Sequence, residues 1–145
     1  MNLRAVSVLA FGLMVLGIVA MYWSGALLGR SSPAIAVQIA AVGLMVWARM
    51  TFGSRSFHAA ANPTRGGLVT TGPYHYVRHP IYAAATYFVW AGALDHRTLT
   101  AVGAALLVTA GGALRMRAEE QLLVAMYPEY GDYKARTARV VPYVL

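Results

Sequence analysis

Four stretches of apolar residues, separated by short polar segments, dominate the chain. They cover residues 5–28, 33–52, 80–94 and 98–114. A helix needs about 20 apolar residues to cross a bilayer core, so the first two stretches are long enough to span it. The last two are shorter and are separated only by Asp95-His96-Arg97, which predicts a helical hairpin. The pattern therefore predicts an all-α integral membrane protein with about four transmembrane helices.

The pattern changes after the fourth stretch. Met116, Leu123 and Tyr127 recur at helical spacing and leave charged residues on the other faces. This spacing predicts that the fourth span continues as an amphipathic helix beyond the membrane. Pro128 interrupts that helix, and residues 129–136 form a second short helical piece. We therefore expect a cytoplasmic amphipathic C-terminal helical tail.

Composition supports a membrane protein of one domain, residues 1–145. Hydrophobic residues make up 59% of the 145 residues and charged residues 12%, against roughly 25% charged residues in soluble domains. A net charge of +7 is also found in nucleic-acid-binding proteins. Here the basic residues flank apolar stretches, so membrane anchoring explains them better and we expect no nucleic-acid partner. The stretch 5–28 is longer than a signal-peptide core and is interpreted as the first span.

Charge also predicts the orientation in the membrane. With four spans, the two termini and the loop between the second and third spans lie on one side. Of the 12 Lys and Arg residues, only Arg30 and Arg97 lie on the opposite side. Positive residues are enriched in cytoplasmic loops, so we expect both termini and the polar loop over residues 53–76 to be cytoplasmic.

The polar segment 72–82 contains two prolines, two histidines, an arginine and three tyrosines between apolar stretches. Gly72-Pro73 predicts a turn. His79 precedes a proline, which favours an extended backbone. Pro80 suits the first turn of a helix, where its missing N–H costs nothing. The segment therefore predicts a turn, a short extended piece and the start of the third span, with polar groups at the membrane boundary.

Two separated blocks of sequence resemble the isoprenylcysteine carboxyl methyltransferase family and the related phospholipid N-methyltransferases. The matching positions are residues 68–74, 77–80 and Tyr82, followed by Glu119, Glu120, Tyr130, Tyr133, Arg136 and Pro142. Ala84 stands where these relatives usually have glycine. The resemblance implies an S-adenosylmethionine-dependent membrane methyltransferase with cofactor-binding elements at 68–82 and 115–142.

The resemblance also implies which residues surround the cofactor. It places His79, Pro80, Tyr82, Glu119 and Glu120 around the cofactor, and side-chain chemistry adds Tyr74 and Arg78 to the expected cofactor-binding residues. Their chemistry suits S-adenosylmethionine, because carboxylates can bind its ammonium group or ribose hydroxyls. Arg78, His79 and the N–H groups at the start of the third helix can bind its carboxylate. Tyrosines offer flat faces or hydroxyl groups.

Methyl transfer is an in-line displacement that depends on positioning and electrostatics. A carboxylate acceptor needs no general base, and an arginine can hold it with two parallel hydrogen bonds. Arg115, which resembles the family's arginine at that place, is the first candidate for this catalytic role, and Arg136 is the second. For an amine or thiol acceptor, His79 or Glu119 is the candidate base. We expect a lipophilic or lipid-modified acceptor that arrives from the bilayer.

These residues also have structural explanations. Glu119 can form a solvated i,i+4 pair with Arg115, and Arg78 can bind lipid phosphates. Tyrosines at this level can act as interfacial anchors. His75 and His79 lack a nearby third ligand, and the chain has no cysteine, so we expect no metal site.

Two other classes of protein were considered. A small four-helix transporter for hydrophobic cations typically needs an acidic residue inside a span, and none of the four stretches contains one. A purely structural membrane protein leaves both matching blocks unexplained. A soluble Rossmann-type methyltransferase is excluded because the chain lacks the glycine-rich strand-to-helix fingerprint. The oligomeric state stays open, and a homodimer that shields the pocket is compatible with four spans.

Overall fold

The structure is a computed structural model that describes residues 2–53 and 67–144. Part of the polar loop expected over residues 53–76, including Arg55 and Arg65, lies outside the described residues. The α-helices of the described residues are α1 (Leu3–Trp23), α2 (Ser32–Phe52), α3 (Pro80–His96), α4 (Leu99–Met126) and α5 (Tyr130–Arg136), and the 3-10 helix η2 covers Gly72–His75.

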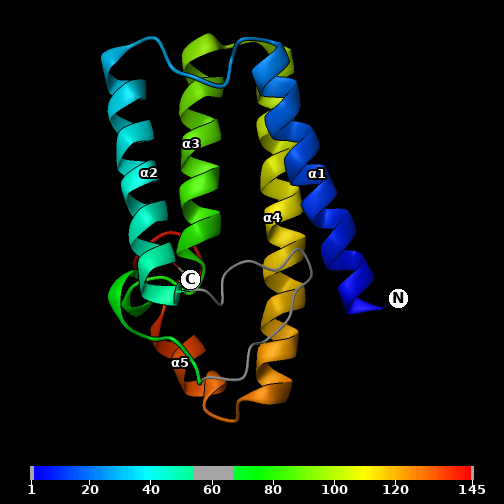
Figure 1. Ribbon diagram of the computed structural model, residues 1–145, viewed down its shortest axis with the longest axis vertical. Coiled ribbons are helices and arrows are strands. Elements are labelled where there is room, and N and C mark those ends of the chain that lie inside the picture. The colour runs from blue at the N-terminus through cyan, green and yellow to red at the C-terminus, as the bar shows by residue number, and fades with distance from the viewer. Residues whose placement is uncertain (1, 54–66, 145) are drawn as a thin grey trace.

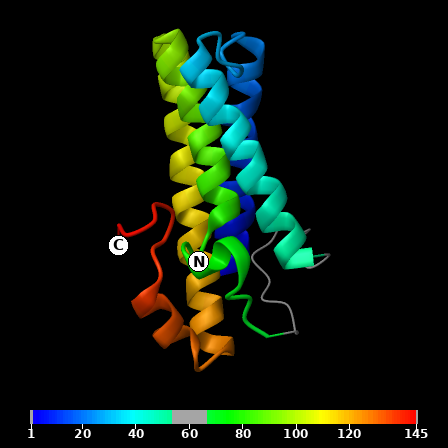
Figure 2. The ribbon, with the colours of Figure 1, turned by 90° about the vertical axis from the view of Figure 1, so that its left-hand side faces the viewer.

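The four long helices stand side by side in the order α2, α3, α4, α1 (Figure 1). The contacts between neighbours, α1 with α4, α3 with α4 and α2 with α3, agree with this order. α4 extends beyond the other helices at one end, where α5 and the C-terminal residues pack beside it (Figure 2). The two polar blocks of the sequence meet at this end of the bundle.

The all-helical membrane architecture predicted from the sequence is confirmed. α1, α2 and α4 are long and apolar enough to cross a membrane, so the protein is an integral, multi-pass membrane protein. α3 is shorter, with 17 residues, and packs between α2 and α4. α4 continues without a break from the apolar stretch into the charged segment and ends at Met126, before Pro128, as the periodicity predicted.

The first span ends earlier than predicted. α1 stops at Trp23, whereas the apolar stretch runs to residue 28. Gly25 has a φ of 68°, a left-handed conformation that stops a helix and that glycine adopts at little cost. The Ser24 hydroxyl donates to the carbonyl of Met21 at 3.1 Å. Hydrophobicity alone did not reveal this turn because the residues after it are apolar.

Polar contacts tie the loops together at the end of the bundle opposite α5. The Asp95 carboxylate accepts hydrogen bonds from the backbone N–H groups of Arg30 at 2.5 Å and Ser31 at 3.2 Å. Arg97 adopts a left-handed conformation with φ 53° and ends α3, which produces the predicted tight turn. Gln38, buried within α2, accepts from the N–H of Gly29 and donates to the carbonyl of Leu27. The bonds of the buried Gln38 satisfy polar groups that water cannot reach inside a bilayer, whereas those of Asp95 lie at the exposed loop.

Glycines allow α1 and α4 to pack closely. A Cβ atom on Gly17 would lie 2.7 Å from the carbonyl oxygen of Ala104. A Cβ atom on Gly111 would lie 2.6 Å from the carbonyl oxygen of Ala10. Small residues at such crossings let membrane helices approach each other.

Gly17→Ala should lower the thermal unfolding midpoint in detergent, because the added methyl group meets backbone that cannot move aside. Overpacking costs about 1–3 kcal/mol, and the gain of roughly 1 kcal/mol in helix propensity offsets part of it. Gly12→Ala is the matched control on the same helix, since its added methyl group would meet no atom within 4 Å outside its own helix backbone among the described residues. Equal midpoints for the two variants would contradict close packing of α1 on α4.

Candidate active site

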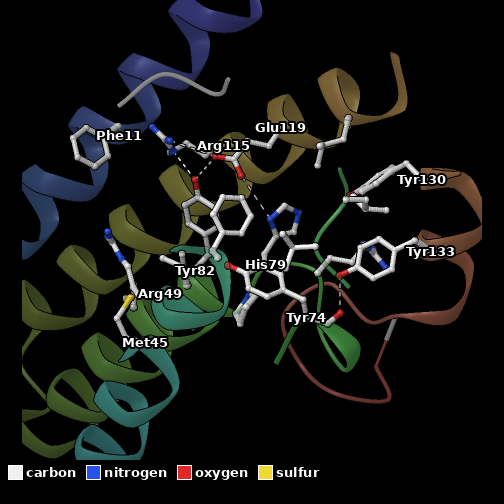
Figure 3. Close-up of a pocket in the computed structure, with 18 of the residues that line it drawn as sticks. Phe11, Met45, Arg49, Tyr74, His79, Tyr82, Arg115, Glu119, Tyr130 and Tyr133 are labelled. Carbon is white, nitrogen blue, oxygen red and sulfur yellow. Dashed lines mark hydrogen bonds and ion pairs between the residues drawn. The ribbon is translucent and has the colours of Figure 1, made fainter. Parts of the chain in front are cut away.

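A cavity of about 400 Å³ lies at the α5 end of the bundle, surrounded by α1, α2, α3 and α4 (Figure 3). Its wall has three chemically different parts. One part is apolar, with side chains from α1 and α2. The central part carries charged residues from α3 and α4, and the third part is rich in tyrosines near α5.

The apolar part of the wall is formed by Phe11, Met14 and Ile18 of α1 and by Met45 and Phe52 of α2. Phe11, Ile18 and Met45 belong to segments with much surface outside the bundle, since less than a third of the apolar windows of α1 and α2 is buried. This part of the cavity therefore borders the region that lipid chains would occupy.

Arg115, Tyr82 and Glu119 form a connected group in the centre of the cavity (Figure 3). Arg115 Nε donates to the Tyr82 hydroxyl at 2.7 Å, and that hydroxyl donates to Glu119 Oε1. Arg115 Nη2 lies 3.3 Å from the same carboxylate oxygen. The i,i+4 pair considered above exists, but Arg115 is only 4% exposed and the pair faces the cavity rather than bulk solvent.

His79 lies between two carboxylates. Its Nδ1 is 3.7 Å from Glu119 Oε2, and its Nε2 is 3.2 Å from Glu120 Oε1. His79 is 5% exposed and immediately precedes α3, where Pro80 provides the first helical residue. The imidazole thus connects the carboxylate that faces the cavity with one that lies behind it.

Glu120 is buried but is not part of the cavity wall. Arg139 holds it through two bonds, from Nε to Oε1 at 3.1 Å and from Nη2 to Oε2 at 2.7 Å. Arg78 Nε donates to Oε1 at 3.2 Å, and Lys134 Nζ lies 3.8 Å from Oε2. Successive helical residues point about 100° apart, which explains why Glu119 and Glu120 face different surroundings.

The C-terminal segment pairs with the residues just before α3. The N–H of Arg78 donates to the carbonyl of Ala138 at 2.8 Å, and the N–H of His79 donates to the carbonyl of Arg139 at 3.1 Å. Val77 and Ala138 form an isolated parallel β-bridge. The tail therefore occupies the N–H groups of the two residues that precede α3, which begins at Pro80.

Arg78 also fixes the tail through its side chain. Its Nη1 donates to the carbonyl of Lys134 at 3.0 Å and to the carbonyl of Thr137. The bond from Arg139 to the carboxylate of Glu120 raises the pKa of the Arg139 guanidinium above its ordinary value. Both arginines hold the tail against α4.

Four tyrosines line the end of the cavity nearest α5: Tyr74, Tyr127, Tyr130 and Tyr133. The Tyr133 hydroxyl donates to the carbonyl of Tyr74 at 2.7 Å. Burial raises the pKa of Tyr133 to about 12, so its hydroxyl keeps the proton that it donates. Tyr130 is 1% exposed, and its hydroxyl has no hydrogen-bond partner among the described residues.

Most of the residues expected from the sequence meet in this cavity. Those that line it are Tyr74, Arg78, His79, Pro80, Tyr82, Arg115 and Glu119. Glu120 does not line the cavity but contacts two residues that do, Arg78 and His79. Arg136 is exposed on α5 and does not line the cavity.

Sequence reasoning did not single out several residues of the site. Arg139 was counted only among the positive charges, although it is the main partner of Glu120. Arg49 lines the cavity from α2, and it was visible in the sequence as the sole charge within an apolar stretch. Tyr130 and Tyr133 belonged to the matching block but were not assigned a role in the site.

These features define a membrane protein whose helices enclose a charged, aromatic pocket at one end of the bundle. Residues 34–130 match the phospholipid methyltransferase family. This match covers more than half of the chain and includes both polar blocks up to Tyr130. The chain belongs to this family of membrane methyltransferases.

The chain is also similar to the nickel-cobalt-cadmium resistance protein NccN of Alcaligenes xylosoxydans xylosoxydans. The two are 38% identical over 78 residues, which cover 52% of this chain and 36% of the relative. The match thus extends over about a third of the length of that relative. No solved structure matches the chain.

Arg139→Ala should loosen the tail, because it removes the bidentate partner of Glu120. The Arg139 side chain is 35% exposed, so we expect the free energy of opening the tail to fall by about 1 kcal/mol. This corresponds to about fivefold faster amide hydrogen exchange over residues 137–140. Arg136→Ala is the control, since Arg136 is exposed and no bond from it is found among the described residues. Unchanged exchange in Arg139→Ala would show that the backbone bonds alone hold the tail.

Proposed function

We propose that the protein is an S-adenosylmethionine-dependent methyltransferase that acts on an amphipathic, lipid-like acceptor. One observation carries this proposal: Arg78, His79 and Tyr82 from one matching block line the same cavity as Arg115 and Glu119 from the other. Because the chain belongs to the phospholipid methyltransferase family, methyl transfer is the expected chemistry.

The residues of the cavity suit this cofactor. S-adenosylmethionine, when bound, supplies an electrophilic methyl group on a sulfonium. Glu119 presents a carboxylate to its ammonium group, and Arg78 presents a cation to its carboxylate. Tyr74 and Pro80 contribute flat, uncharged surfaces to the wall of the cavity. We assign Glu120 an indirect role, in which it holds Arg78 and His79 in place.

The size of the cavity limits where the acceptor can lie. A volume of about 400 Å³ is near the lower end of the roughly 300–1,000 Å³ of small-molecule pockets. It therefore does not enclose a nucleoside cofactor together with a long alkyl chain. We infer that the reactive head of the acceptor enters past Phe11 and Met45, while its chain stays in the bilayer.

Arg115 is the residue we assign to acceptor positioning. Its guanidinium lies within the cavity, 5.2 Å from the centre of the Phe11 ring on the apolar side. A carboxylate acceptor held there attacks the methyl carbon in line and needs no base. Arg136 is less suitable because it lies outside the cavity. For an amine acceptor, Glu119 can take the proton, with His79 beside it at 3.7 Å.

We further propose that the cavity opens on the cytoplasmic side. The N-terminus of α1, the segment before α3 and the C-terminal tail lie at the same end of the bundle (Figure 1). Of the Lys and Arg residues that the structure describes, all but Arg30 and Arg97 lie toward this end, and such residues are enriched in cytoplasmic segments. A cytoplasmic cofactor would then reach the site directly.

The cofactor is tested by calorimetry of S-adenosylhomocysteine binding to the protein in detergent. We expect micromolar binding by the wild type and at least a tenfold weaker affinity for Glu119→Gln and His79→Ala, which remove a carboxylate and its neighbour. Glu129→Gln, at an exposed position, controls for the loss of charge. Folded wild-type protein that does not bind in several lipid compositions would overturn the proposed function.

Arg115→Lys should lower kcat/KM for a carboxylate acceptor by about 10- to 100-fold, because lysine cannot form two parallel hydrogen bonds. The product of carboxylate methylation is an ester. When the methyl donor carries a labelled methyl group, mild alkali should therefore release the label from the product as methanol. Arg117→Lys is the control at the exposed position two residues away. An alkali-stable product would indicate methylation of nitrogen or sulfur and would reject the carboxylate acceptor.

A further inference from the structure

Residues 140–144, Val-Val-Pro-Tyr-Val, form an apolar segment that follows the tail residues paired with the segment before α3. None of these five residues lines the cavity. Residues 141–144 are exposed, and Tyr143 is 94% exposed. Neighbouring apolar residues with this much free surface are typical of a region that contacts a partner or a membrane.

The segment lies beside the first turns of α3. The Tyr87 hydroxyl donates to the carbonyl of Val140 at 2.6 Å. Tyr87 comes seven residues after Pro80, the first residue of α3, which corresponds to about 10 Å along the helix axis. Tyrosine side chains on a helix point back toward its first residue. Val140 is therefore held at the level of the first two turns of α3.

The membrane spans begin and end at this same level. The C-terminal segment rises from α5 to the height at which α1 begins and α2 ends (Figure 2). α1 and α2 each have 21 residues, or roughly 30 Å of helix, which matches the thickness of a hydrocarbon core. Residues 140–144 therefore lie at the boundary between membrane and water, where tyrosine is enriched because its ring is apolar and its hydroxyl polar.

A β-turn presents the Tyr143 ring away from the protein. The N–H of Val144 donates to the carbonyl of Val141 at 3.1 Å, with Pro142 and Tyr143 at the two central positions. Tyr143 has a φ of 63°, a left-handed conformation that is unfavourable for a bulky residue. Its exposed ring gains little from packing within the protein. A contact outside the chain accounts for a tyrosine at this position.

We propose that residues 141–144 form an interfacial anchor, which inserts into the headgroup region of the bilayer and holds the tail in place. The partner of this surface is lipid. A protein partner is less suitable, because four residues are far fewer than the roughly 20–30 residues per side of a standard protein interface. The inference does not depend on the reaction that takes place in the cavity, and it therefore stands apart from the proposed function.

The anchor is adjacent to the bonds that complete the cavity wall. The carbonyls of Ala138 and Arg139 accept hydrogen bonds from the two residues that precede α3. The Arg139 side chain holds the buried carboxylate of Glu120. Only Val140 separates these contacts from the exposed segment. Lipid contact at residues 141–144 should therefore stabilise the pairing of the tail.

A fluorescent label at Tyr143→Cys tests the contact with lipid, because the chain has no cysteine of its own. In nanodiscs that hold one protein each, lipids with a nitroxide near the headgroup should quench the label. Iodide in the water should quench it about threefold less than a label at Glu129→Cys. Glu129 is the control because it is exposed in the turn between α4 and α5, at the far end of the molecule (Figure 2).

Two results of this experiment would overturn the inference. Equal quenching by iodide at the two positions would show that Tyr143 lies in water. Protection from iodide without quenching by the nitroxide lipids would show that protein, rather than lipid, covers the segment.

Tyr143→Ser tests whether the anchor holds the tail. In nanodiscs, amide hydrogen exchange over residues 137–140 should become about three- to tenfold faster, since the apolar ring no longer binds the membrane. Tyr143→Phe keeps the ring and should stay close to wild type. Tyr22→Ser is the matched control, because it removes an exposed tyrosine near the end of α1 on the opposite side of the membrane. Exchange that is unchanged in Tyr143→Ser would overturn the anchoring role.

Discussion

The structure of the site depends on one buried carboxylate, that of Glu120. Removing a carboxylate from water costs several kcal/mol unless cations and hydrogen bonds surround it, and here Arg78, His79 and Arg139 do so. These partners come from the segment before α3 and from the tail, while Glu120 itself lies on α4. One charge therefore joins three parts of the chain, and the wall of the cavity depends on this connection.

The three parts of the cavity wall suit different ligand groups. Its apolar part borders the bilayer, its charged centre lies at the ends of α3 and α4, and its tyrosine-lined end faces the tail. In the proposed function, the head of the acceptor enters from the apolar part and is held at Arg115, beside the cofactor bound by Glu119 and Arg78. This arrangement lets a water-soluble molecule react with one that stays in the membrane.

The helices and most residues of the site could be predicted from the sequence, but the contacts between those residues could not. Apolar runs predict membrane helices because a bilayer requires them, and α2 began and ended within one residue of the prediction. The separate roles of Glu119 and Glu120 depend on which side of α4 each faces. Their neighbouring positions in the sequence do not reveal this difference. Arg139 was equally hidden, because its partner lies 19 residues away across a proline and a second helix.

The pairing of residues 76–79 with 137–140 has a consequence for biosynthesis. Chains are made from the N-terminus, and membrane helices insert as they emerge. α1 to α4 can therefore assemble in the bilayer before Arg139 has been synthesised. Until then, Glu120 lacks its bidentate partner, and the N–H groups of Arg78 and His79 lack their acceptors. The helix bundle is thus complete earlier in translation than the pocket, whose last wall is added by the tail.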